Sequence, residues 1–189
     1  MFIRSERLFL RPGWPEDWAE LHALIDDEAV VRNLSRAPWP YGPDDAKSFV
    51  ALPQANRHPH FFVTLPGAHG SRLVGCVGLA QYGQETELGY WIGRQHWGRG
   101  YATEAARAVL SLARSLGHRR VIATPFADNA GSARVLAKSG FRATGEVRKI
   151  RSPARSEPMA AMVHAVDLAA PLDCDGPKDG GFASMRRAA

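Results

Sequence analysis

Residues 94–104 form a short connection, rich in glycine and arginine, between a strand pattern and a helix pattern. The preceding residues, 86–92, are apolar and β-prone, and the following ones repeat alanine, valine and leucine at helical spacing as far as residue 116. Gly117 ends the helix pattern. A strand that runs through a glycine-rich loop into an amphipathic helix is typical of α/β proteins, so we expect a fold of this class.

The remaining patterns extend this prediction to most of the chain. Helix patterns follow Pro15, Asp44 and Asn129, in addition to the one that starts at residue 101. Strand patterns occupy residues 2–11, 61–65, 73–80, 86–92, 121–124, 143–150 and 159–168. Their order predicts a mixed central sheet of about seven strands with about four helices. Gly89, inside the strand at 86–92, predicts a bulge there.

Length and composition are those of one ordinary domain. The chain has 189 residues, of which 45% are hydrophobic and 23% charged, and this excludes wholesale disorder. Two cysteines far apart, Cys76 and Cys174, exclude a disulfide scaffold. No apolar run approaches the ~20 residues that span a bilayer, and residues 1–11 lack the apolar core of a signal peptide. We therefore expect a cytoplasmic protein with one domain at 1–168 and a flexible tail at 169–189.

The glycine-rich connection has the chemistry of a phosphate site. The first N–H groups of a helix lack partners inside the helix, and the helix dipole makes that end positive. Gly98 and Gly100 let an anion approach these groups, and Arg94 and Arg99 add positive charge. An ATP-binding P-loop would need Gly-Lys-Ser or Gly-Lys-Thr at its end, which is absent here. A dinucleotide-binding fingerprint would belong to an early strand–helix–strand unit, whereas this loop lies halfway along the chain.

Three motifs follow one another in the same order as in a known family. They are Glu-Leu-Gly-Tyr-Trp-Ile at 87–92, Gln95-x-x-Gly98-x-Gly100, and Asn-Ala-Gly-Ser at 129–132. Over residues 8–168 the chain resembles the GNAT superfamily of acyl-CoA-dependent N-acyltransferases, and most of all the branch that includes bacterial ribosomal-protein N-terminal acetyltransferases. The resemblance implies the GNAT fold, whose central sheet is splayed in the middle. It also implies acetyl-CoA as the cosubstrate and no metal.

The resemblance also implies where acetyl-CoA binds. In GNAT proteins the pyrophosphate sits on the loop amides, here those of residues 98–102. The pantetheine arm runs between two splayed parallel strands, here 86–92 and 121–126, and pairs with the backbone of the first. The predicted cofactor-binding residues are Trp91, Ile92, Gly93, Gln95, Gly98, Arg99, Gly100, Tyr101, Ala102 and Asn129.

Attack of an amine on the thioester needs an acceptor for the amine's proton and a donor to the departing thiolate. Many GNAT enzymes have a donor tyrosine seven residues after the asparagine, but Leu136 stands there in this chain. The branch that it resembles has serine at the position of Ser132, which is therefore the predicted donor. Asn129 would hold the pantetheine amide or order the loop; alternatively, both residues only cap a helix. Glu87 is the predicted base, directly or through water, unless it is a solvated strand charge.

The predicted reaction is acetyl transfer to a primary amine by direct attack in a ternary complex, with a protein or peptide N-terminus as acceptor. An α-amine, with a pKa of ~8, is easier to deprotonate than lysine at ~10.4. Trp39 and Tyr41, in a proline-rich loop, would form a wall of the acceptor site or would only pack. The alternatives are an acetyltransferase of a small amine, such as an antibiotic or metabolite, and a non-catalytic acyl-CoA-binding domain.

Charge and histidine spacing add weaker expectations. The net charge of +5 suits an anionic small molecule or nucleic acid, and it equally suits simple solubility. The basic residues at 148–151 and Arg155 are best explained as a solvated strand edge, so we expect neither nucleic acid nor a membrane as partner. His58 and His60 are two ligands at most, which do not make a metal site. Either a monomer or a homodimer fits.

Overall fold

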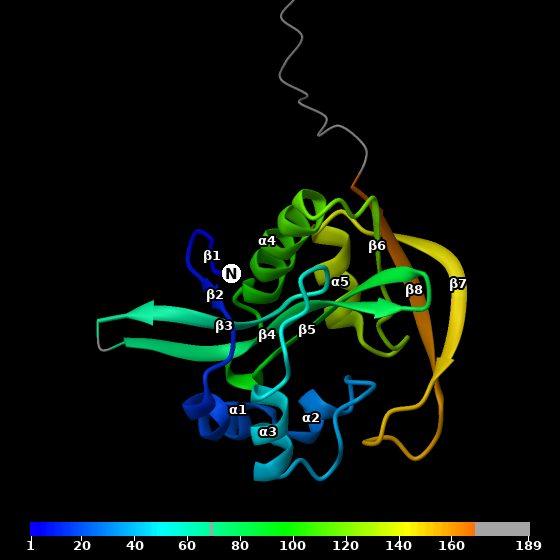
Figure 1. Ribbon diagram of the computed structural model, residues 1–189. Coiled ribbons are helices and arrows are strands. Elements are labelled where there is room, and N and C mark those ends of the chain that lie inside the picture. Colours follow the sequence, from blue (N-terminus) through cyan, green and yellow to red (C-terminus); the bar gives the residue numbers. More distant parts are fainter. Residues whose placement is uncertain (69, 169–189) are drawn as a thin grey trace, which may run out of the picture.

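The computed structural model describes residues 1–68 and 70–168, and its strands form one mixed sheet in the order β1-β2-β3-β4-β5-β6-β8-β7 (Figure 1). The strands are β1 (Ile3–Arg4), β2 (Phe9–Arg11), β3 (His60–Gly67), β4 (Gly70–Tyr82), β5 (Glu85–Ile92), β6 (Arg120–Ala123), β7 (Arg142–Ile150) and β8 (Met159–Asp167). The α-helices are α1 (Trp18–Ile25), α2 (Glu28–Val31), α3 (Pro43–Val50), α4 (Tyr101–Ser115) and α5 (Ala130–Lys138), with 3-10 helices at Pro15–Asp17 and Arg94–His96. The predicted α/β class is confirmed, with eight strands and five α-helices instead of about seven and four. The predicted tail at 169–189 lies outside the described residues.

The N-terminal segment predicted as one strand at 2–11 is two short strands instead. The chain turns back between β1 and β2, where the Ser5 N–H donates to the Leu8 carbonyl at 3.0 Å. Glu104, on α4, holds this turn: its carboxylate accepts hydrogen bonds from Ser5 Oγ at 2.7 Å and from the Arg7 N–H at 2.7 Å. Burial alone would raise the pKa of Glu104, but these hydrogen bonds hold it below its ordinary value. Contacts to a residue far along the chain therefore decide this break.

Helices cover both faces of the sheet, with α4 and α5 on one side and α1 to α3 on the other (Figure 1). The core under α4 includes Val63, Leu88, Ile92, Ala105 and Val109, and the core under α1 and α3 includes Leu21, Leu24, Ala46, Phe62 and Trp91. Strand β5 contributes to both, because side chains alternate between the two faces of a strand. Its Leu88 and Ile92 face α4, whereas Trp91 faces α1 and α3.

The sheet is splayed in the middle, as expected, because the parallel strands β5 and β6 share one registered pair, Glu87 opposite Ile122. Strand β6 is instead paired with β8 along its whole length. Strand β5 keeps an uninterrupted register with β4 from Glu85 to Ile92. The bulge predicted at Gly89 is therefore wrong, and the divergence comes from the course of β6 rather than from a defect in β5.

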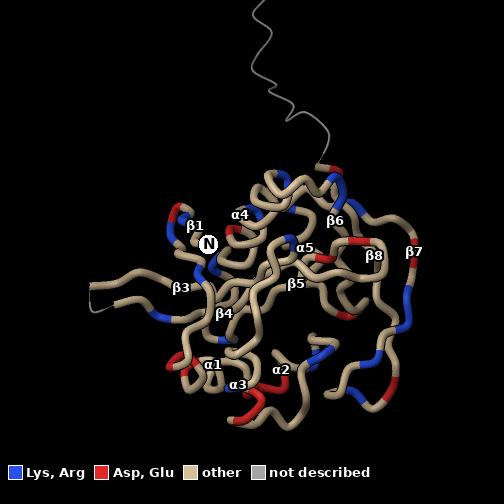
Figure 2. Tube along the Cα trace, viewed as in Figure 1, with Lys and Arg blue, Asp and Glu red and all other residues tan. Residues whose placement is uncertain are grey.

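Basic residues run along the edge strand β7 and the connection to β8 (Figure 2). Arg148 is not free, because it donates to Glu146 at 2.6 Å and to Glu85 at 2.9 Å. Its guanidinium also lies 5.0 Å from the centre of the Tyr82 ring. Charges of both signs on an edge strand discourage pairing with another sheet, which is the expected role of a solvated edge.

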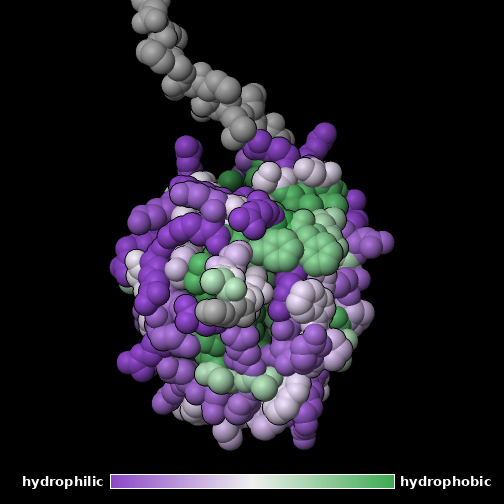
Figure 3. Space-filling model, turned by 90° about the vertical axis from the view of Figure 1, so that its left-hand side faces the viewer, coloured by the Kyte–Doolittle hydropathy of each residue, from purple (hydrophilic) through white to green (hydrophobic). Residues whose placement is uncertain are grey.

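The face from which the β3–β4 hairpin projects is mostly hydrophilic, with apolar side chains gathered to one side (Figure 3). Two large apolar residues at the N-terminal end of the sheet are exposed, Met1 at 59% and Phe2 at 58%. The Phe2 ring stacks on that of Phe9, with 5.7 Å between the ring centres. In the described part of the chain, no helix has the length and apolar character needed to cross a membrane. No group of three or more His, Cys, Asp or Glu residues in that part is arranged to hold a metal ion.

Candidate active site

A cleft of about 830 Å³ lies beside the diverging ends of β5 and β6. Its walls are α2 with the residues after it, the end of β5, the loop and first turn of α4, and the connection from β6 with the first turns of α5. This volume is in the range of small-molecule sites. The predicted site residues that line it are Trp91, Ile92, Gly98, Gly100, Tyr101, Ala102, Asn129 and Ser132. Gly93, Gln95 and Arg99 belong to the same segment but are not among the lining residues.

The loop before α4 has a backbone shape that requires two glycines. Gly98 and Gly100 have φ angles of +75° and +81°, in the left-handed region that other residues avoid. Gly100 caps the helix, and its carbonyl accepts the Glu104 N–H at 3.1 Å. The N–H groups of the first turn, from Tyr101 on, have no partners inside the helix. With the positive end of the helix dipole, these groups can bind an anion.

His96 lies just before this loop and lines the cleft, and the sequence interpretation missed it. Its side chain is 5% exposed, and its Nδ1 has no hydrogen-bond partner among the described residues. Burial lowers the pKa of His96, and the charges of Arg72 and Arg99 lower it further. The lowered pKa favours the neutral imidazole at pH 7, and its Nδ1 is a buried polar atom without a partner among the described residues.

The backbone at the end of β5 faces the opening between the strands. The Gly93 N–H donates to the Val74 carbonyl at 2.9 Å, and alternate residues of an antiparallel pair point their N–H and C=O groups to the partner strand. The backbone N–H and C=O groups of Tyr90 and Ile92 therefore point away from β4, into the space that opens where β6 diverges from β5. The Ile92 carbonyl already accepts a hydrogen bond from Trp97 Nε1 at 2.6 Å.

Two hydroxyl groups meet in the cleft. Ser132, in the first turn of α5, has its Oγ 2.7 Å from Tyr90 Oη. Asn129 is the N-cap of α5, and its Oδ1 accepts the Ser132 N–H at 2.9 Å. Burial raises the pKa of Tyr90 to about 12, although the hydrogen bond with Ser132 lowers it somewhat, so the phenol stays protonated at neutral pH. The sequence interpretation missed Tyr90; the alternation of β5, which puts Tyr90 on the face of Leu88 and Ile92, was the available signal.

Glu87 lies on the other face of β5. It is on the same face of β5 as Trp91, but unlike Trp91 it is not among the residues that line the cleft. Its side chain is partly buried and has no hydrogen bond or ion pair among residues 1–68 and 70–168. Glu87 and Ile122 are the one registered pair of β5 and β6 among the described residues, so Glu87 lies where the two strands part.

Trp39 and Tyr41, predicted to wall the acceptor site, are not brought to the cleft. Tyr41 is 5% exposed and belongs to the core under α1 and α3. Burial raises the pKa of its phenol. Trp39 is 37% exposed, in the loop before α3. Packing, the second explanation given above, describes the position of Tyr41.

The family described as the acetyltransferase (GNAT) domain matches residues 7–142. A protein of Bacillus subtilis, the uncharacterized N-acetyltransferase YoaA, is 30% identical over 161 residues, which cover 78% of this chain and 86% of that protein. The crystal structure of a GNAT-family acetyltransferase from Bacillus anthracis has a TM-score of 0.77 at 29% identity, over 89% of this chain and 99% of that one.

A more distant structure shares the fold. RimL, described as a ribosomal L7/L12 α-N-protein acetyltransferase in complex with coenzyme A, has a TM-score of 0.75 at 18% identity, over 90% of this chain and 100% of that one. The family match and the identity to YoaA together cover most of the described sheet and the whole glycine-rich loop. The chain therefore belongs to the GNAT acetyltransferase family, and the class predicted from its sequence, an acyl-CoA-dependent N-acetyltransferase, is confirmed.

Proposed function

We propose that this protein transfers the acetyl group of acetyl-CoA to the N-terminal amine of a protein or peptide, by direct attack of the amine in a ternary complex. The proposal is supported by the shape of the cleft. A single cleft joins the anion-binding loop at residues 98–102 to the hydroxyl pair of Ser132 and Tyr90, beside the point where β5 and β6 part. The loop suits the phosphates of the cosubstrate, and the hydroxyl pair suits the proton transfer at its thioester.

The residues of the loop fit a pyrophosphate. The helix N-terminus supplies N–H donors and positive potential, and His96 supplies a buried nitrogen without a partner. The pantetheine arm would lie along the backbone of Tyr90 and Ile92. Because the Ile92 carbonyl is bonded to Trp97, Tyr90 is the pairing partner that requires no movement of the Trp97 indole. RimL, which shares the fold, is described with coenzyme A bound.

Ser132 would act as the acid of the reaction. A C–N bond forms as the amine attacks, the C–S bond breaks, and the departing sulfur takes a proton from Ser132 Oγ, which recovers a proton from solvent after the thiol leaves. Tyr90 Oη, 2.7 Å away, would donate a hydrogen bond to Ser132 Oγ and so support this donation. Leu136, at the position where many relatives carry tyrosine, is fully buried at 0% exposure and has no proton to give.

Glu87 would accept the proton that the amine loses, directly or through a water molecule. Its carboxylate has no partner among the described residues, and it lies where β5 and β6 separate. The base and the acid would then approach the thioester from opposite faces of β5. The N-terminal amine is the preferred acceptor because its pKa of about 8 is lower than that of lysine, about 10.4. One partly buried carboxylate is then sufficient to deprotonate it.

The test uses peptides that contain one lysine and have either a free or a blocked N-terminus. Mass spectrometry after incubation with acetyl-CoA should find one acetyl group on the α-amine of the free peptide and none on the blocked one. Glu87→Gln should lower the rate by about 10²-fold or more, as expected for loss of a general base. Glu157→Gln, an exposed control, should not. Acetylation of lysine in the blocked peptide, or of small amines alone, would contradict the proposal.

A further inference from the structure

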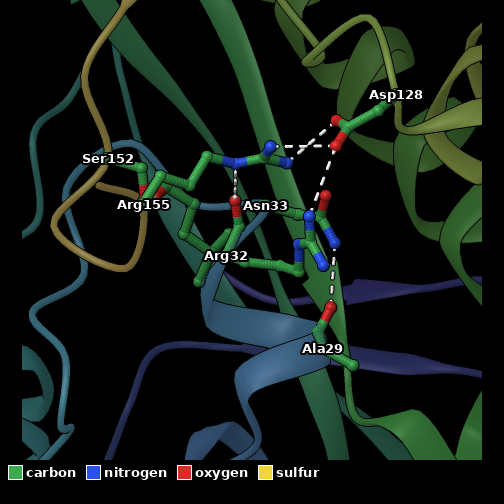
Figure 4. A network of polar contacts seen from close by, with 7 residues as sticks. Ala29, Arg32, Asn33, Asp128, Ser152 and Arg155 are labelled. Atoms are coloured by element: carbon green, nitrogen blue, oxygen red, sulfur yellow. Dashed lines mark hydrogen bonds and ion pairs between the residues drawn. The ribbon is translucent and has the colours of Figure 1, made fainter. Parts of the chain in front are cut away.

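Three separate segments meet at the α2 end of the cleft, and an arginine–aspartate network joins them (Figure 4). Arg32 follows α2, Asp128 precedes α5, and Arg155 comes from the connection between β7 and β8. Arg155 donates to both oxygens of Asp128, from Nη1 at 2.8 Å and from Nη2 at 2.9 Å. Its Nε donates to the Arg32 carbonyl at 2.7 Å. The network fixes the backbone that carries Arg32.

Arg155 and Asp128 neutralise each other's charge and fill each other's hydrogen-bonding positions. The Arg155 side chain is 8% exposed and its guanidinium lies 4.4 Å from the centre of the Phe126 ring. Hydrogen bonds and charge from Arg155 hold the pKa of Asp128 below its ordinary value, so the carboxylate is ionised and its charge is matched. A bidentate pair of this kind leaves little negative charge for an incoming ammonium group.

The Arg32 side chain, by contrast, is largely unpaired. It is 49% exposed, and its one polar contact among the described residues is with Asp128 at 3.5 Å, the limit of a hydrogen bond. Most of its five donors are therefore open, on a side chain that lines the cleft. The charged residues of the lining are three cations, Arg32, Arg134 and Lys138, and one carboxylate, Asp128, which Arg155 neutralises.

We infer that the acceptor carries a carboxylate close to its reactive amine, and that Arg32 binds this carboxylate. A planar guanidinium with open donors recognises a carboxylate with two parallel hydrogen bonds. The inference rests on the proposed function, and within it names the acceptor as a peptide whose first few residues include aspartate or glutamate.

The experiment measures kcat/KM for pairs of peptides that differ by one atom group. Aspartate or asparagine stands at position 2, and glutamate or glutamine at position 3, with acetyl-CoA at saturation. The acidic member of at least one pair should be acetylated with kcat/KM higher by about tenfold or more, mainly through KM. Arg32→Gln should remove this difference while leaving acetyl-CoA affinity unchanged, and Arg32→Lys should keep part of it.

Two further variants complete the design. Arg36→Gln removes a charge from an exposed side chain that does not line the cleft, so it should retain the preference for acidic peptides. Arg32→Glu should reverse the preference, towards a peptide with lysine at the same position. A reversal of this kind cannot result from loss of folding alone.

The outcomes separate the two claims. Equal kcat/KM for acidic and amide peptides, with efficient α-amine acetylation, would overturn the role of Arg32 and leave the proposed function intact. A loss of acetyl-CoA affinity in Arg32→Gln without a change of peptide preference would also overturn it. Faster acetylation of free acidic amino acids than of any peptide would support the carboxylate site and overturn the peptide assignment. No transfer to any acceptor would overturn both.

Discussion

Tyr90 Oη lies 2.7 Å from Ser132 Oγ, although the two residues are 42 positions apart and come from β5 and α5. Tyr90 Oη is also 3.2 Å from the Ser132 carbonyl oxygen, to which it can donate. When Tyr90 donates to Ser132 Oγ, the serine hydrogen is free to point into the cleft. The serine hydroxyl can therefore donate its proton to a bound thioester or to Tyr90 Oη.

Substitution of the pair should affect turnover in a graded way. Ser132→Ala removes the proposed donor to sulfur and should lower kcat by about 10²-fold or more. Tyr90→Phe removes a supporting hydrogen bond and should lower kcat by about fivefold, since one hydrogen bond contributes ~1 kcal/mol. Steady-state rates with an α-amine peptide measure both. An unchanged kcat in Ser132→Ala would remove the serine from the mechanism.

The raised pKa of Tyr90, about 12, predicts the form of the pH profile. The phenol should stay protonated up to about pH 11, so wild type and Tyr90→Phe should show the same pH dependence of kcat between pH 7 and 10. A loss of activity near pH 9–10 in wild type that is absent from Tyr90→Phe would show that the phenol ionises much earlier.

Gly98→Asp should abolish binding of CoA. The position has open space for a Cβ but a φ of +75°, and the new carboxylate would repel a pyrophosphate. Gly83→Asp is the matched control, because Gly83 also has a positive φ of +58° and open space, in the turn between β4 and β5, away from the cleft. Quenching of tryptophan fluorescence on titration with CoA compares them. Equal affinities in the two variants would place the phosphates elsewhere.

Asp17→Asn should destabilise the fold strongly. Asp17 is bound by both terminal nitrogens of Arg11, at 2.6 and 2.7 Å, and the two residues are 6% and 3% exposed. Loss of the carboxylate leaves a buried guanidinium unpaired, which costs about 3–5 kcal/mol. Urea denaturation measures the free energy of unfolding. Asp44→Asn, at an exposed ion pair, should leave it unchanged, and equal effects of the two would contradict the burial argument.

The stability should fall below pH 7, partly through His58. Burial lowers the pKa of His58, and the charges of His118 and Arg57 lower it further. The unfolded chain therefore takes up the proton at a higher pH than the folded one, so this contribution is complete above about pH 6.5 and is lost as the pH falls from there through the lower pKa of the folded state. His58→Gln should reduce the loss of unfolding free energy between pH 7 and 5. An identical slope in both proteins would contradict this assignment.

The elements that depend on local pattern were predictable from the sequence. The helix at 101–115, its glycine-rich loop and the hairpin of β3 and β4 follow from apolar spacing and glycine placement, which act over a few residues. The break between β1 and β2 did not follow, because Glu104 sets it from a distant part of the chain. Local alternation carries no information about such a partner.

The residues of the candidate site also divide into those set by local pattern and those set by contacts between distant segments. The glycine-rich loop before α4 and the cap formed by Asn129 and Ser132 are local features, and both were predicted. Tyr90 and Arg32 were not, because their importance depends on which segments the sheet brings together. Tyr41 was assigned to the acceptor site from its aromatic character, whereas burial against α1 and α3 determines its position.

Calorimetric titration with acetyl-CoA, and separately with desulfo-CoA, tests whether the glycine-rich loop and the end of β5 bind the cosubstrate. Both should bind one per chain, with dissociation constants of about 1 μM to 1 mM, because the loop and the end of β5 would contact the parts that the two molecules share. Absence of binding by both would contradict this assignment of the cosubstrate site, since the loop at residues 94–104 would then be a glycine-rich turn without a ligand.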